Sequence, residues 1–370
     1  MPSTFFDIQW PELLPFKDEI YVISDRRCMF DAVGNVVEDI NSAKAAGKTK
    51  LIFNCPDETL RPSALKKAHL IVDRIDTLAG NIFYITGHSD GPSAYYSWAL
   101  KTGQRNRMTI LTSLAQILQF RDSARSISMP EPMYDIKIKD KKFVCFNKVH
   151  RGHRVYILAK MLENGLVDQS YFSFEGAWPN WINELERYDW APVIDAQLSK
   201  NIDRFPMRLN ITEDRTNPVQ MDHDDIRFHT NSYFSLVTET IFHKHLGPER
   251  GSNYECVDGI FFTEKIGRPL LLKHPFILAG AEYSLRRLRQ LGFKTFHPFI
   301  DESYDIEVND DKRLDMIIAE TERLCKFTDD QWLEWQQNIK EIVEHNYTHL
   351  MSMPKYSVMT NVAELFKINR

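Results

Sequence analysis

The stretch FFTEKIGRPLLLKHPFILAGAEYSLRRLRQLGFKTFHPFIDESYD, residues 261–305, decides the expected fold class. Near its start stands Thr263, a residue type that is common at the beginning of helices. Residues 275–280 form a short apolar run ending in glycine, which is typical of a buried strand in a parallel sheet. The pattern then predicts a basic amphipathic helix over 283–290 and a second strand over 293–299. Helices and strands that alternate with short joints indicate an α/β unit.

Two charged residues, Glu264 and Lys265, lie at the start of the first of these helices. The first backbone N–H groups of a helix have no partner within the helix, and its N-terminus favours negative charge. Side chains at this position can therefore contact an anionic ligand together with the backbone. The competing interpretation is an ordinary solvated pair on a helix surface.

These residues resemble the donor-binding half of GT-B glycosyltransferases, most closely the fucosyltransferase and exostosin-like group. The resemblance rests on the aromatic pair followed by Thr-Glu-Lys at 263–265, and on the apolar strand over 233–238 that ends in Glu239. It extends from about residue 142 to 323 and does not cover the first hundred residues. It implies an α/β protein with two Rossmann-like domains facing a cleft, of a bacterial or phage type.

The N-terminal part of the chain also has an α/β pattern. Short apolar segments over 19–25, 50–55 and 81–87, with helical segments between them, predict the first half of a doubly wound parallel sheet. No GxGxxG follows the first segment, which argues against an NAD-type fold. We therefore expect an acceptor domain over 1–125 and a nucleotide-sugar-binding domain over 140–350.

Several segments are expected to connect or move these domains. Residues 123–137 hold two prolines and no strong period, which predicts an interdomain linker and hinge. The polar residues 202–225 predict a long loop that a bound donor would order. Two long helices are expected over 311–325 and 329–349, and residues 351–370 are expected to cross back to the first domain.

The composition limits the class of protein. With 370 residues, of which 43% are hydrophobic, the chain is long enough for two domains with substantial cores. A net charge of -5 argues against a protein that coats nucleic acid. Five scattered cysteines without a CxxC indicate reduced thiols and no zinc site. No apolar run reaches about eighteen residues, so we expect no membrane span and a cytoplasmic location.

A polar and basic cluster follows the strand predicted over 142–147. It contains Asn147, Arg151 and Arg154. Guanidinium groups bind phosphate oxygens in pairs. Basic residues are disfavoured in the first turn of a helix, so their presence there points to a ligand or a partner rather than to a solvated helix start. The resemblance implies that one of the two arginines contacts the donor pyrophosphate.

The resemblance also implies roles for the charged residues near the central helix. Glu264 would accept hydrogen bonds from the donor ribose, and Lys265 would neutralise phosphate charge. Glu239 either caps the following helix or faces the sugar. The expected co-substrate is a nucleotide-diphosphate sugar, with a GDP-sugar as the first guess from the resemblance alone.

Glycosyl transfer with inversion needs a group that takes the proton of the acceptor hydroxyl. His88 and Asp90 follow the third predicted strand, beside glycines that permit close approach of a ligand. Asp25 follows the first strand and is a further possibility. We expect Asp90 or His88 to be the base.

The segment Asp222-His223-Asp224 contains a DxD and the beginning of an HxD pattern, both of which occur in metal sites. It stands inside the predicted loop and precedes its strand, so a charged loop is the better interpretation. We expect no essential metal and no cofactor besides the nucleotide sugar.

The sequence therefore predicts an inverting, metal-independent glycosyltransferase that acts on an acceptor hydroxyl. The acceptor stays open between glycan, lipid-linked sugar, protein and modified nucleic acid. One alternative is a DNA-modifying glycosyltransferase that acts on a flipped hydroxymethylated base. Its basic rim would consist of Lys101, Arg105, Arg107, Arg121 and Arg125. An alternative of another class is a catalytically inactive GT-B-like binding module.

Overall fold

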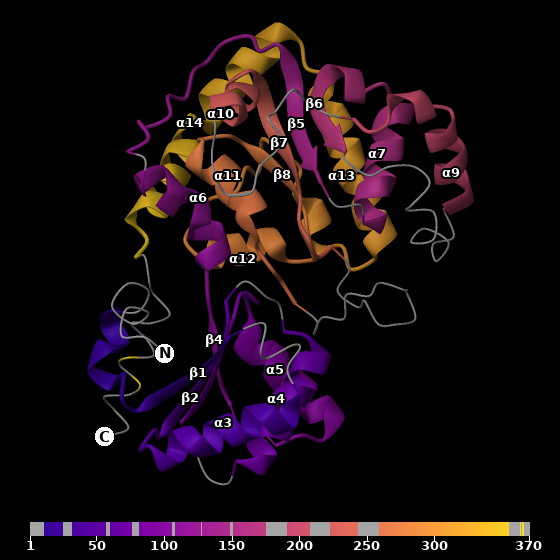
Figure 1. Cartoon of the computed structure of the whole chain (residues 1–370). Coiled ribbons are helices and arrows are strands. Elements are labelled where there is room, and N and C mark those ends of the chain that lie inside the picture. Colours follow the sequence, from indigo (N-terminus) through magenta and orange to yellow (C-terminus); the bar gives the residue numbers. More distant parts are fainter. Residues whose placement is uncertain are drawn as a thin grey trace. The chain divides into compact units, whose positions relative to one another are not determined.

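The computed structural model divides into two compact units (Figure 1). The first unit comprises Met1–Gln116, Tyr254–Phe261 and Met353–Arg370, and the second comprises Ile117–Asn253 and Phe262–Ser352. The structure describes residues 11–24, 32–56, 60–75, 81–105, 108–126, 128–148, 151–174, 191–207, 223–242, 259–354, 363 and 365. None of the helices in these ranges has the length and apolar character needed to cross a membrane.

The first unit contains a sheet of four parallel strands that lie in chain order. The strands are β1 (Ile20–Ser24), β2 (Lys50–Cys55), β3 (Ile82–Thr86) and β4 (Thr109–Thr112). The helices that connect them are α3 (Val33–Ala45), α4 (Pro62–Arg74) and α5 (Gly91–Thr102). Every connection moves to the next strand in the same direction, and such crossovers are right-handed, so all three helices belong on one face of the sheet.

The core of the first unit agrees with this arrangement. Leu51 and Phe53 of β2 are buried in one cluster with residues of α3, α4 and α5, whereas Ile52 is buried in a second cluster. Successive side chains of a strand point to opposite faces, so the two clusters lie on opposite faces of the sheet. The second face is covered by the 3-10 helix η1 (Pro11–Phe16) and by Ala363 near the C-terminus. The described strands of this sheet contain no reversal of strand order.

The second unit also contains four parallel strands, but in the order β6-β5-β7-β8. These are β5 (Lys141–Asn147), β6 (Ser170–Phe174), β7 (Ser232–Thr238) and β8 (Phe276–Ala279). The chain runs outward from β5 to β6, and then returns past β5 to form β7. The strand order therefore reverses between β5 and β7. In open α/β sheets, ligands bind at such a switch point, outside the carboxyl ends of the strands.

Helices cover both faces of this second sheet. The helices of this unit are α6 (Ala115–Ser126, mostly in this unit), α7 (Gly152–Glu163), α9 (Ala191–Ser199), α10 (His223–Thr230), α11 (Glu264–Leu271), α12 (Ser284–Gln290), α13 (Asp310–Cys325) and α14 (Asp329–Ser352). Short 3-10 helices are η2 (Val167–Gln169), η3 (Ile202–Arg204) and η5 (Ser303–Ile306). α7 contacts α13, α11 contacts α14, and the two pairs lie on opposite sides of the sheet (Figure 1). Connections that run in two directions from a switch point require this result.

The second core is rich in aromatic side chains. The ring of Trp332 from α14 is fully buried and stacks on Tyr233 of β7, with centroids 3.9 Å apart. Lys142 places its ammonium group over both rings, within 5.8 Å of their centroids. Aromatic stacking and burial of large side chains therefore fix α14 on β7.

The structure confirms the expected α/β class, with two parallel sheets that are compatible with two Rossmann-like domains. α11, β8 and α12 confirm the helix, strand and helix predicted at the start of the central stretch. α13 and α14 confirm the two long helices predicted near the C-terminus.

The strand predicted over 293–299 is wrong. The main-chain N–H and C=O of Lys294 bond to the side chain of Asn346, and the N–H of Phe296 donates to Glu302. These backbone groups are satisfied by side chains, so the segment has no need of a neighbouring strand.

The predicted linker and loop also differ from the structure. Most of α6 and all of the described residues between α6 and β5 belong to the second unit. Within that segment Glu131 pairs with Lys273, 2.5 Å away, and the Tyr134 hydroxyl donates to the carbonyl of Gln336. The predicted loop over 202–225 begins with η3 and ends in the first turn of α10, and residues 208–222 lie outside the described ranges.

Candidate anion-binding site

The two strands that border the switch point are tied together at their carboxyl ends. The Thr238 hydroxyl at the end of β7 donates to Oδ1 of Asn147 at the end of β5, at 2.6 Å. The amide nitrogen of Asn147 lies 3.2 Å from the Cys145 sulfur, and the side chain is buried. Asn147 therefore links the ends of β5 and β7, and its Oδ1 already accepts a hydrogen bond within the protein.

Two arginines lie at the N-terminus of α7, above this edge. Arg151 is the N-cap residue and is partly exposed. Arg154 is buried, and its Nη2 donates to the carbonyls of Thr238 and Glu239 at 3.0 and 3.2 Å. Burial and the charge of Arg151 lower the pKa of Arg154 to about 10, although Glu239 opposes the shift. Arg154 thus positions the end of β7, and Arg151 is the arginine with access to solvent.

Glu239, the residue after β7, joins the sheet edge to the start of α11. Its carboxylate accepts the Thr263 N–H at 3.1 Å and the Thr263 hydroxyl at 2.5 Å, and its exposed fraction is 1%. Burial raises the pKa of the Glu239 carboxyl, while the charge of Lys265 and the bonds from Thr263 oppose that shift. Of the two roles predicted for Glu239, the structure shows contact with the helix start.

Lys265 is held in the first turn of α11 by three oxygen atoms. Its Nζ lies 2.9 Å from Glu264 Oε1, 3.2 Å from the Thr263 hydroxyl and 3.5 Å from the Thr240 hydroxyl. The side chains of Glu264 and Lys265 are 26% and 27% exposed, so both reach solvent. Burial would raise the pKa of Glu264, but the charge and hydrogen bond of Lys265 outweigh it, and the pKa lies below its usual value.

The third helix N-terminus on this side of the sheet, that of α12, is closed by a carboxylate. Asp305 accepts the backbone N–H groups of Leu285 and Arg286 at 2.7 and 2.9 Å. An acidic side chain at this position takes the place that an anionic ligand would need. Basic side chains lie in the first turns of α7 and α11 (Arg154 and Lys265), as Arg286 does in α12, so it is the carboxylate of Asp305 that sets α12 apart. The site of the second unit therefore combines helix N-termini with Arg151, Arg154 and Lys265.

His88 and Asp90 form a pair in the first unit, between β3 and α5. His88 Nε2 lies 3.1 Å from Asp90 Oδ1, and the His88 side chain is fully buried, whereas that of Asp90 is 40% exposed. Burial would raise the pKa of Asp90, but the hydrogen bond and charge of His88 lower it on balance. Of the two predicted bases, Asp90 is the one with access to solvent.

Residues 259–261 cover this pair. The Ser89 N–H donates to the carbonyl of Ile260 at 2.7 Å, and the Ile260 N–H donates to Asp90 at 3.2 Å. Gly259 has a φ of +153°, and a methyl group on it would overlap His88 Nε2. A glycine is therefore required for this segment to lie so close to the histidine ring.

One of the five residues of the basic rim considered for DNA binding, Arg121, does not lie at the surface. Arg121 is fully buried, and its guanidinium bonds to Asp122 and to the carbonyl of Leu350 in the second unit. Lys101 and Arg105 are exposed in the first unit, and Arg107 lies outside the described residues. Arg121 is thus a structural residue of α6.

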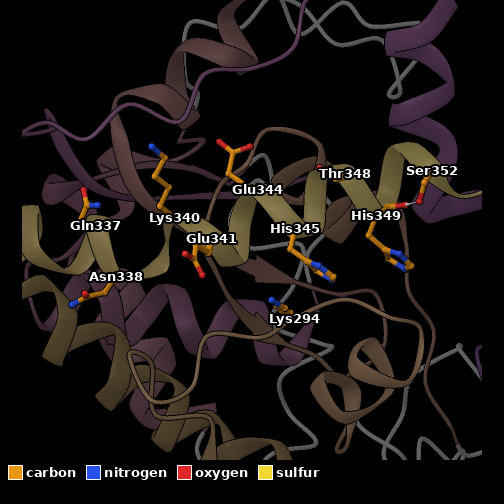
Figure 2. Close-up of a pocket in the computed structure, with 10 residues that line it drawn as sticks. All are labelled: Lys294, Gln337, Asn338, Lys340, Glu341, Glu344, His345, Thr348, His349 and Ser352. Atoms are coloured by element: carbon orange, nitrogen blue, oxygen red, sulfur yellow. Dashed lines mark hydrogen bonds between the residues drawn. The ribbon is translucent and has the colours of Figure 1, made fainter.

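An open groove runs along α14, and none of the predicted site residues is among those that line it. His345 and His349 point to one side of the helix, whereas Lys340 and Glu344 point away from them (Figure 2). Both histidines donate from Nε2 to carbonyls just beyond the end of α12, at 2.9 and 2.7 Å. Glu344 pairs with Lys273. The groove mixes both signs of charge, so it indicates no particular ligand chemistry.

In the described ranges, no three His, Cys, Asp or Glu side chains are grouped so that they could hold a metal ion. The DxD segment is not tested by this result, because Asp222 and the side chain of Asp224 lie outside the described residues.

The chain matches no protein-family model, no curated protein and no solved structure. The function proposed below therefore rests on the site geometry and on the resemblance carried by the Thr-Glu-Lys segment.

Three contacts that shape these sites are not indicated by the sequence patterns. Thr263 is recognisable as a helix cap, but its bond to Glu239 spans 24 residues and has no local signal. Asp305 closes α12 from 20 residues away. Gly259 precedes an aromatic pair without any turn motif, and only its positive φ and the nearby His88 ring show why it is glycine.

Proposed function

We propose that the protein is a glycosyltransferase that transfers a sugar from a nucleotide-diphosphate sugar to an acceptor hydroxyl. One observation carries this proposal: α7 and α11 begin at the switch point of the second sheet, with Arg151 as the N-cap residue of α7 and with Arg154 and Lys265 in the first turns. Basic side chains are unfavourable in a helix first turn unless an anion is bound there. A bound diphosphate can accept hydrogen bonds from the backbone N–H groups at the helix N-termini, and it can also pair with the basic side chains.

In this proposal the residues of the second unit bind and activate the donor. Lys265 and Arg151 offset the negative charge that develops on the diphosphate leaving group, as preorganised electrostatic stabilisation requires. Glu264 accepts hydrogen bonds from vicinal hydroxyls of the ribose, for which an ionised carboxylate is suited. The lowered pKa of Glu264 keeps it ionised at neutral pH. Asp90 stays the proposed base for the acceptor.

A panel of nucleotide-diphosphate sugars tests the proposal. We expect release of the nucleoside diphosphate from at least one donor, slowly by hydrolysis and faster with an acceptor, and loss of this activity in Lys265→Ala. The GDP-sugars are the first members to test. Absence of both binding and turnover across the panel would contradict the proposal.

One observation favours a second candidate, a GT-B-like module that binds a nucleotide without transferring a sugar. The bond from His88 lowers the pKa of Asp90, and a weaker base is less able to accept a proton from an alcohol. This candidate predicts nucleotide-diphosphate binding with no turnover for any donor or acceptor. Turnover that is lost in Lys265→Ala would exclude it.

A further inference from the structure

The buried carboxylate of Glu239 has a role beyond positioning α11. Resting on the proposed function, we propose that binding of a nucleoside diphosphate at Lys265 is coupled to the uptake of a proton by Glu239. The ligand class is the same as in the proposed function, and the inference adds how the site adjusts its own charge.

The starting point is a carboxylate that is removed from water and that, among the described residues, accepts hydrogen bonds from uncharged donors. Thr263 provides its N–H and hydroxyl, and the N–H of Thr240 lies 3.3 Å from Oε2. The nearest positive charge in this network is the ammonium group of Lys265, which lies 3.2 Å from the same Thr263 hydroxyl. One hydroxyl group therefore separates Glu239 from Lys265.

The other charged groups around Glu239 contact its main chain or carry the same sign. From α7, Arg154 and His153 bond to the carbonyl of Glu239, at 3.2 and 3.0 Å. From α11, Glu264 adds a second negative charge beside Lys265. From β8, the backbone carbonyl of Ala279 accepts the Glu239 N–H at 2.9 Å. Lys265 thus provides the charge that most directly offsets the carboxylate, in agreement with its effect on the pKa of Glu239.

A bound diphosphate removes this compensation. When the ammonium group of Lys265 turns toward phosphate, Glu239 remains buried beside added negative charge, which disfavours its ionised form. Transfer of one proton from solvent to a Glu239 oxygen removes the unfavourable charge. Glu264 loses the same partner, but its side chain is 26% exposed and keeps the charge of Arg268 nearby, so its ionised form is disfavoured less than that of Glu239.

The proton also changes what Thr263 can do. In the ligand-free site its single hydroxyl hydrogen is given to Glu239. A protonated Glu239 can donate to the Thr263 oxygen instead, and the Thr263 hydrogen is then released to bond to the ligand. Proton uptake therefore supplies one more donor at the N-terminus of α11. It follows that affinity for the diphosphate decreases as the pH rises.

Calorimetry can measure how many protons the protein takes up when GDP binds. GDP is titrated into wild type, Glu239→Gln and Glu264→Gln, each in two buffers of different ionisation enthalpy, at two pH values near neutrality. Titration of GDP itself is common to all three proteins, so differences between them isolate the protein groups. We expect wild type and Glu264→Gln to take up as much as one proton more per GDP than Glu239→Gln. Equal proton uptake by wild type and Glu239→Gln would overturn the inference.

Two further measurements keep the outcomes distinct. If Glu239→Gln does not fold, infrared difference spectra of wild type with and without GDP replace it. A new band of a protonated carboxyl group is expected, and its absence would contradict the inference. If neither GDP nor inorganic pyrophosphate binds to wild type, the proposed function fails together with the inference. If GDP binds but wild type and Glu239→Gln take up the same number of protons, the inference about Glu239 fails and the proposed function is not contradicted.

Discussion

The carboxylate of Glu239 accepts hydrogen bonds from both the N–H and the hydroxyl of Thr263, 24 residues further along the chain. Glu239 follows β7 and Thr263 caps α11, so this contact fixes the start of the helix at the carboxyl edge of the sheet. The same hydroxyl is bonded to Lys265, whose position therefore depends on the contact. The pair thus links the fold of the second unit to the chemistry proposed for it.

Removing the Thr263 hydroxyl should destabilise the second unit. Thr263→Val keeps the shape of the side chain but loses the cap of α11 and one donor to a buried carboxylate. Loss of a helix cap costs about 0.5–2 kcal/mol. Thr263→Ser is the matched control, because it retains the hydroxyl. Urea unfolding of the two variants measures the difference, and equal stability of both would contradict the role given to this contact.

The stability of the protein should depend on the protonation of Glu239. The folded state raises the pKa of this carboxyl above its usual value of 4.5, so the folded state holds the proton more tightly than the unfolded state. The resulting stabilisation is present at low pH and is lost as the pH rises through the folded pKa. Glu239→Gln should therefore show a smaller decrease in stability with rising pH than wild type. Parallel pH profiles of the unfolding free energy would exclude the raised pKa.

A methyl group at Gly259 should disturb the covering of His88 in the first unit. Gly259→Ala introduces an overlap with the His88 ring in addition to backbone strain. Gly47→Ala is the control, because Gly47 also has a positive φ but nothing lies within 4 Å of the added carbon. Overpacking costs about 1–3 kcal/mol. Hydrogen exchange at the Ser89 N–H, which donates to Ile260, should accelerate in Gly259→Ala beyond any change in Gly47→Ala.

Replacing Asp90 should affect sugar transfer but not donor binding. If Asp90 is the base, Asp90→Asn should reduce sugar transfer by about 10²-fold or more, the usual contribution of a positioned base. GDP affinity should be unchanged, because the residue belongs to the acceptor side of the reaction. Steady-state rates and calorimetry on the same variant test both statements. Full transfer activity in Asp90→Asn would exclude Asp90 as the base.

The elements that could be predicted from the sequence are those fixed by interactions between residues close together in the chain. α11 and β8 are predictable because their apolar patterns, the capping Thr263 and the short joints are all local. The reversal of strand order between β5 and β7 has no local signal, although it determines where the site lies. For the same reason the segment after Gly292 is mistaken for a strand. Its backbone partners, Asn346 and Glu302, lie on elements that the pattern cannot place beside it.

The residue types of the candidate site could be predicted from the sequence, but the role of each residue could not. Arg154 and Asn147 fit a phosphate site by position, yet the structure engages both in holding the ends of β5 and β7. Burial separates such residues from Arg151 and Lys265, which reach solvent. Burial depends on the packing of distant helices, so a single sequence does not reveal it.

The most direct test of the central claim is the affinity for GDP of Lys265→Ala compared with Lys340→Ala, an exposed lysine on α14 far from the site in sequence. Loss of a hydrogen bond to a charged group costs about 1.5–3 kcal/mol. By calorimetry we predict that Lys265→Ala weakens GDP binding by about 10- to 150-fold, with an unchanged fold, while Lys340→Ala binds as wild type. Equal affinities of all three proteins would contradict the assignment of this site.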